Sequence, residues 1–106
     1  MSGCAVVLVA VSSEEEAQSI TSAILENRKA ACVSIIPGVA SHFWWQGKID
    51  KADEALLIIK TMTSTVPDIV RIVKQNHKYT VPEIIALPVI AGNDDYLDWI
   101  NREVKE

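Results

Sequence analysis

The feature that most constrains this chain is a pair of segments that are apolar along their whole length. Residues 55–59 read Ala-Leu-Leu-Ile-Ile, so an extended strand there is apolar on both faces. Residues 84–91 carry no polar side chain at all. A strand with one face in water alternates between apolar and polar residues. These segments therefore indicate a sheet that is covered on both faces.

The order of the predicted elements indicates an α+β fold. Strands are expected over residues 5–11, 31–45, 49–61 and 84–91, and helices after residues 13, 63–65 and 93. Strand, helix, strand, strand, helix, strand, helix is the split β–α–β arrangement called ferredoxin-like, with an antiparallel sheet and a C-terminal helix. A chain of 106 residues is predicted to form a single domain over residues 1–106.

The helix boundaries are predicted from capping residues. Ser13 with Glu16 is typical of a capping box at the start of the first helix. Arg28 falls on the apolar stripe of this helix, and Arg28 and Lys29 are placed in its last turn, where cations are favoured. Residues 63–65 are expected to cap the second helix, and Asn93 the third.

Residues 31–45 and 49–61 are predicted to form a long hairpin around the turn at residues 46–48. Pro37 and Gly38 interrupt the first arm, so a bulge or bend is expected there. The arms are longer than the other strands can pair with, so the tip should project from the domain.

Two helices of this arrangement cover one face of the sheet and leave the other without a cover. At roughly 25 cal/mol per Å² of apolar area, exposure of that face forfeits several kcal/mol. An identical chain is the commonest partner for such a face, so we expect a homo-oligomer. The alternative is that the third helix folds under the sheet and covers part of it.

Composition excludes several partners. The net charge is −4 and the basic residues are scattered, which disfavours nucleic acid and charged membrane surfaces. No apolar run approaches the roughly 20 residues that span a bilayer, and no targeting segment is visible. Two cysteines without signs of secretion indicate reduced thiols, and therefore a cytoplasmic protein.

Candidate chemistry is confined to one short segment and one cysteine. His77, Tyr79 and Glu83 lie close together in the sequence, and an imidazole with a carboxylate can share a divalent ion, with Cys32 as a possible thiolate ligand. The alternative is a loop whose polar groups bond to the backbone, with Cys32 as a small buried residue. Phosphate-binding, serine-hydrolase and zinc-protease motifs are lacking, so no enzyme is predicted.

Several segments taken together resemble the CutA family of divalent-cation tolerance proteins, in order and over nearly the whole chain. They are residues 30–38 (Ala-Ala-Cys-Val-Ser-Ile-Ile-Pro-Gly), 44–49 (Trp-Trp-Gln-Gly-Lys-Ile), 57–61 (Leu-Ile-Ile-Lys-Thr), 77–83 (His-Lys-Tyr-Thr-Val-Pro-Glu) and 96–100 (Tyr-Leu-Asp-Trp-Ile).

The resemblance implies a PII-like homotrimer formed by edge pairing of strands, a link to copper or another divalent cation, and no established enzymatic activity. Alternatively, the resemblance implies a PII-like signalling or scaffolding trimer that binds a small molecule or a protein partner in clefts between subunits. The shared residues expected at these clefts and interfaces are Trp44, Trp45, Lys60, Tyr79, Pro82 and Trp99.

A metal site carries over from the family only in part. Some bacterial relatives are proposed to use a first-strand Cys, a loop His and the Glu after the proline. The loop residues correspond to His77 and Glu83, whereas Val9 stands at the first-strand position and Asn76 where some relatives have a second His. Cys32 matches a family cysteine. The resemblance therefore implies a weaker site that uses His77 and Glu83.

Overall fold

The protein is described from a computed structural model that covers residues 3–106. Its elements are β1 (Cys4–Val11), α1 (Glu14–Glu26), β2 (Cys32–Trp45), β3 (Lys48–Met62), a 3-10 turn (Thr63–Thr65), α2 (Val66–Asn76), β4 (Ile84–Pro88) and α3 (Asp94–Glu103). The strands form one antiparallel four-stranded sheet in the order β2-β3-β1-β4. This arrangement confirms the predicted ferredoxin-like α+β fold.

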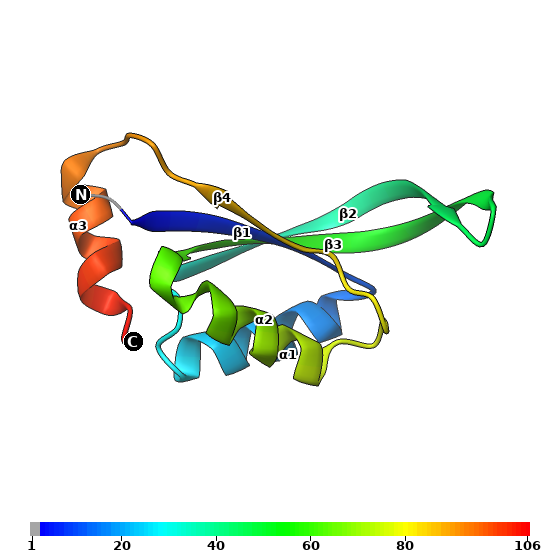
Figure 1. Cartoon of the computed structure of the whole chain (residues 1–106). Coiled ribbons are helices and arrows are strands. Elements are labelled where there is room, and N and C mark those ends of the chain that lie inside the picture. Colours follow the sequence, from blue (N-terminus) through cyan, green and yellow to red (C-terminus); the bar gives the residue numbers. More distant parts are fainter. Residues whose placement is uncertain (1–2) are drawn as a thin grey trace.

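Helices α1 and α2 lie side by side on one face of the sheet (Figure 1). The core lies between these helices and the sheet. Strands β1 and β3 point every second side chain toward the helices, and these side chains are apolar. Val7, Leu57 and Ile59 on the strands, and Ile20 and Ile69 on the helices, are fully buried there. Residues 55–59 were predicted to be apolar and covered on both faces, and the burial of Ala55, Leu57 and Ile59 confirms this for the helix side of the sheet.

The end of α1 differs from the prediction. The helix ends at Glu26, and Arg28 lies beyond it, exposed, with a φ of 58°. The N–H of Arg28 donates to the carbonyl of Leu25, and that of Lys29 to the carbonyl of Ile24, which is the Schellman pattern. Arg28 therefore occupies the left-handed position that glycine usually takes. Its assignment to the buried stripe was wrong, and so was the placement of Arg28 and Lys29 in the last turn, because both follow the helix.

Two further boundaries differ. Residues 63–65 form a separate turn whose side chains do not cap α2; instead the buried Thr65 hydroxyl bonds to Thr61 Oγ1 at 2.6 Å. Strand β4 ends at Pro88 instead of continuing to residue 91. The Val89 N–H still donates to the carbonyl of Cys4 at 3.1 Å, but Cys4 is the first residue of β1, so residues 90 and 91 have no position on β1 to pair with.

The hairpin of β2 and β3 projects beyond the other strands, as predicted (Figure 1). The pairing register shifts between Ile36 and Val39, which confirms the bulge expected at Pro37 and Gly38. Gln46 and Gly47 both have positive φ at the tip, the combination that a tight two-residue hairpin turn requires. The molecule is elongated, with a longest extent of 44 Å.

Helix α3 packs at the end of the sheet opposite the hairpin tip (Figure 1). Asn93 caps it by accepting a hydrogen bond from the N–H of Asp95 at 3.0 Å, as predicted. Ile100 and Val104 bury Cys4 in a small second cluster. Within residues 3–106, no helix combines the length and apolarity needed to cross a lipid bilayer.

Candidate functional site

The face of the sheet that α1 and α2 do not cover is apolar and only partly shielded. The pairing register places Leu8 opposite Ile58 and Ile85, Ile36 opposite Leu56, and Val6 opposite Leu87. We call this surface the open face; its residues are Val6, Leu8, Ile36, Leu56, Ile58, Ile85 and Leu87. Ile36, Ile85 and Leu87 are 42%, 49% and 46% exposed. Helix α3 packs on Cys4 and Met62 at one end of the same side of the sheet, so it covers only part of that side, as the alternative prediction allowed.

Lys60 and Cys32 lie at the end of the open face near α3. They are directly opposite each other in the β2–β3 pair, and Lys60 Nζ donates to Ser34 Oγ at 2.7 Å. Burial and the neighbouring Cys32 thiol raise the pKa of Tyr96, which lies in the first turn of α3. This polar patch of Lys60, Ser34 and Cys32 is thus at the edge of the apolar surface.

His77 lies at the C-terminal end of α2, and its side chain is fully buried. Nε2 is 2.7 Å from the carbonyl oxygen of Ala10, and Nδ1 is 3.0 Å from the N–H of Tyr79. A carbonyl oxygen only accepts, so Nε2 carries the proton and Nδ1 accepts. Nδ1 also lies 3.6 Å from Glu16 Oε2.

Glu16 joins the start of α1 to the loop of residues 77–83. Its carboxylate accepts hydrogen bonds from the Ser12 N–H at 2.8 Å, the Ser12 hydroxyl at 2.8 Å and the Lys78 N–H at 2.6 Å. Burial alone would raise the pKa of Glu16, but these hydrogen bonds and the nearby His77 outweigh burial and lower it. Glu16 is thus a buried carboxylate that fixes the loop to the sheet.

Tyr79 connects the same loop to the hairpin. Its hydroxyl donates to Glu54 Oε2 at 3.0 Å, and its ring lies 4.8 Å from that of His77. Burial, the hydrogen bond to Glu54 and the charges of Glu54 and Glu16 raise the pKa of Tyr79 to about 12. Four residues far apart in the sequence, Glu16, Glu54, His77 and Tyr79, therefore form one network at the end of the sheet.

The Tyr79 hydrogen bond predicts an alkaline transition. Because the folded-state pKa is raised to about 12, Tyr79 contributes stability that is complete below pH about 10, the unfolded value, and is lost as the pH rises toward 12. Phenolate absorbance of the folded protein should therefore appear well above pH 10. In Tyr79→Phe, only the phenolate absorbance of Tyr96 should remain. If Tyr79 in the folded protein titrates with the midpoint of an unfolded chain, its hydrogen bond to Glu54 is contradicted.

The residues predicted to bind metal do not converge within one chain. Both ring nitrogens of His77 are hydrogen-bonded, and Glu83 is exposed on the segment leading into β4. Across the sheet, Cys32 lies in line with Lys60 and Val6. Val6 is four residues before Ala10, whose carbonyl oxygen His77 contacts, so Cys32 and His77 are roughly 13 Å apart along the strand direction alone. Among residues 3–106, no group of three His, Cys, Asp or Glu side chains is placed to hold an ion.

The predicted interface residues on the hairpin are exposed. Trp44 and Trp45 are 72% and 50% exposed near the tip, and Ile49, opposite Trp44, is 66% exposed. Trp45 and Ile49 also line a shallow hollow of about 300 Å³ with Gln46, Lys48 and Asp50. The tip is therefore a projection with exposed apolar side chains.

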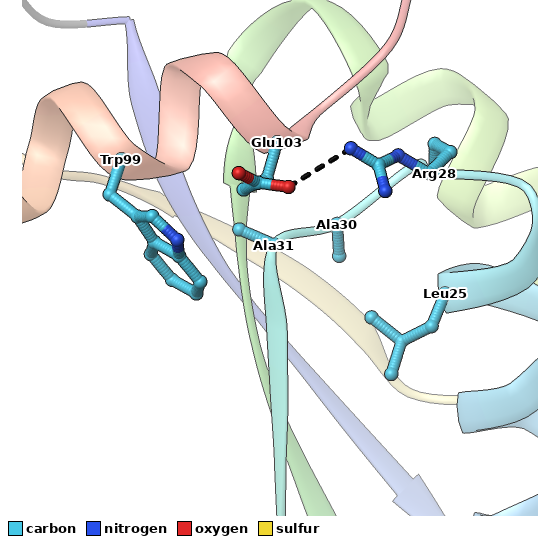
Figure 2. A pocket seen from close by; sticks show the side chains of 6 residues that line it. All are labelled: Leu25, Arg28, Ala30, Ala31, Trp99 and Glu103. Atoms are coloured by element: carbon cyan, nitrogen blue, oxygen red, sulfur yellow. Dashed lines mark hydrogen bonds and ion pairs between the residues drawn. The ribbon is translucent and has the colours of Figure 1, made fainter.

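Trp99 lies at a second hollow, at the opposite end of the molecule. Figure 2 shows its indole on one side and the ion pair of Arg28 with Glu103, at 3.0 Å, on the other. The hollow, of about 340 Å³, is lined by Leu25, Arg28, Ala30, Ala31, Trp99 and Glu103. It is distant from the 77–83 loop and contains no convergent set of polar groups.

The sequence did not identify Glu16 and Glu54 as members of the loop network. Ser13 Oγ accepts from the Glu16 N–H at 3.1 Å, as a capping box predicts, but the Glu16 carboxylate reaches back to Ser12 instead of Ser13. A glutamate in the first turn of a helix is explained by capping alone. The contact with residue 78 depends on the packing of α1 against α2, which spacing does not reveal.

Comparison with known proteins agrees with this geometry. Residues 5–103 match the family described as CutA1 divalent ion tolerance protein. The divalent-cation tolerance protein CutA of Thermus thermophilus is 50% identical over 97 residues, which cover 92% of this chain and 94% of the relative. Protein CutA 1, chloroplastic, of Oryza sativa is 44% identical over 95% of this chain, which spans 57% of that longer relative.

Solved structures show the same fold. The divalent cation tolerance protein (Cut A1) of Thermus thermophilus superposes with a TM-score of 0.94 at 47% identity, covering 96% of this chain and 99% of that one. CutA1 of Oryza sativa gives 0.94 at 43% identity, covering 97% and 94%. The residues of the resemblance, the long hairpin and the family match agree, and the chain belongs to the CutA1 family of divalent ion tolerance proteins.

Proposed function

We propose that this protein is a non-enzymatic, cytoplasmic homotrimer that takes part in divalent-cation tolerance and binds copper or another divalent ion weakly in clefts between subunits. The observation that carries the proposal is the open face, which is apolar, continuous across β2, β3, β1 and β4, and only partly covered. Copies of the same chain supply a cover of matching chemistry. Both cysteines are free, in keeping with a reducing compartment.

The geometry supports an inter-subunit rather than an intramolecular metal site. Glu83 is exposed and follows Pro82 at the edge of the sheet, where an adjoining chain has access to it. A neighbouring chain would have to complete the ligand set, because Cys32 and His77 of the same chain lie elsewhere. His77 would become a ligand only if Nδ1 released the Tyr79 N–H. We therefore propose Glu83 as the principal ligand.

This proposal predicts that Glu83→Gln weakens binding of divalent copper by about tenfold or more, because the amide keeps the size of the side chain and removes its charge. Isothermal titration should show this loss together with an unchanged assembly mass. Glu26→Gln, at an exposed position of α1, is the matched control and should titrate as the wild type. Equal isotherms for Glu83→Gln and the wild type would remove Glu83 from the site.

A PII-like signalling or scaffolding trimer is the second candidate, and the bonded state of His77 favours it. With both ring nitrogens engaged, the loop presents the partly exposed Tyr79, whose phenol pairs with the Glu54 carboxylate of β3, rather than a free imidazole. Such groups recognise a polar small molecule or a protein segment by hydrogen bonds. Native mass spectrometry of gently purified protein should then show a bound species that Tyr79→Phe loses; a ligand-free spectrum and no captured partner would count against this function.

A further inference from the structure

Two sulfur atoms meet at the end of the sheet that α3 covers. Cys4 and Met62 are directly opposite each other in the β1–β3 pair, so both side chains leave the sheet on the same face. Cys4 Sγ lies 3.8 Å from Met62 Sδ, and also 3.8 Å from the carbonyl oxygen of Leu97. This pair is separate from the 77–83 loop and uses none of the residues proposed above for divalent ions.

The surroundings of the two sulfurs are apolar. Cys4 is 2% exposed and clusters with Ile100 and Val104, and the partly buried hydrophobic side chains packed against them are those of Ala31, Met62, Val89, Leu97 and Trp99. Such an environment disfavours an ion that keeps a net charge. A monovalent cation bound by one thiolate has no net charge, so it is compatible with this cluster in a way that a divalent ion is not.

We propose that Cys4 and Met62 form a binding site for a soft monovalent metal ion, Cu(I) or Ag(I). Thiolate and thioether are the ligands that select Cu(I). With metal–sulfur bonds of about 2.3 Å, as in zinc thiolates, an ion spanning the observed separation has a sulfur–metal–sulfur angle of about 110°. The Cys4 thiol loses its proton to solvent on binding, and the ion keeps its oxidation state.

An entry path is present on the Met62 side. Met62 is only partly buried, and Gly3 stands over it: a Cβ at Gly3 would lie 3.6 Å from Met62 Cε. The φ of +90° at Gly3 also favours glycine. The thioether is therefore reachable, and its flexible side chain can accompany the ion inward to the buried thiol.

The test uses a Cys32→Ser background, in which Cys4 is the only thiol of the chain. Under anaerobic conditions, Cu(I) or Ag(I) is titrated against a competing chelator. The background protein should bind one ion per chain, and adding Cys4→Ser should abolish binding. Adding Met62→Leu should weaken binding by about tenfold or more, because it removes one of the two sulfur ligands.

Met62→Leu conserves side-chain volume, so the fold is expected to persist, and circular dichroism with light scattering checks this. X-ray absorption of the loaded protein should show sulfur in the first coordination shell. Undiminished affinity in Met62→Leu, or no binding by the background protein, would overturn the proposal. Glu83→Gln in the same background should bind the monovalent ion normally. The proposal for this site can therefore be rejected without rejecting the proposal for the divalent site, and the reverse.

Discussion

Ile58→Glu should convert the proposed homotrimer into single chains. Ile58 is at the centre of the open face, opposite Leu8 on one side and Ser34 on the other. Covering the face with a second chain would bury the new carboxylate without a partner, which costs about 3 kcal/mol or more per copy. Light scattering after size exclusion should give the mass of one chain, with a lower midpoint of urea unfolding.

The matched control is Leu25→Glu. Leu25 is 37% exposed on α1, on the helix side of the sheet, so the same charge there meets water. This variant should keep the mass of the wild type. If Ile58→Glu also keeps that mass and its stability, the open face is not an assembly surface. If Leu25→Glu dissociates as well, a nonspecific effect of charge explains both variants.

The second large effect is expected for Glu16→Leu. This change leaves the N–H groups of Ser12 and Lys78 without their acceptor in a buried setting. Each unsatisfied buried donor costs about 1–3 kcal/mol, so the free energy of unfolding should fall by about 3 kcal/mol at equal chain concentration. Glu15→Leu, at an exposed position in the same turn, should change it little.

The charge of Glu16 adds a pH dependence. Its folded-state pKa is lowered from 4.5, so the carboxylate contributes stability that is present above pH 4.5 and is lost as the pH falls through the folded-state value. Glu16→Gln should therefore be less stable than the wild type at pH 7, and the difference should shrink below pH 4.5. A difference that stays constant in acid, or no loss in Glu16→Leu, would contradict the role assigned to this carboxylate.

Patterns that depend on neighbouring residues were predictable. The apolar, buried helix side of residues 55–59, the Asn93 cap and the bulge after Ile36 are each encoded within a few positions, and the structure confirms them. The family resemblance was predictable because its motifs cover nearly the whole chain. The α+β fold followed from the order of elements, since few arrangements accept it.

Features that depend on tertiary packing were not predictable. Arg28 takes a left-handed conformation that its side chain does not favour, because the Schellman bonds and the ion pair with Glu103 hold it there. The contact between Glu16 and residue 78 joins positions 62 apart, and that between Glu54 and Tyr79 joins positions 25 apart. Helical or strand periodicity carries no information about such pairs.

The account depends on the open face being shielded by other copies of the chain. The most direct measurement is the light-scattering mass of the wild-type protein during dilution to low micromolar concentration. The expected result is three chains per particle, with slow hydrogen exchange of the Leu87 amide in β4. A folded protein with the mass of one chain would contradict the account, because its apolar sheet would then be stable in water.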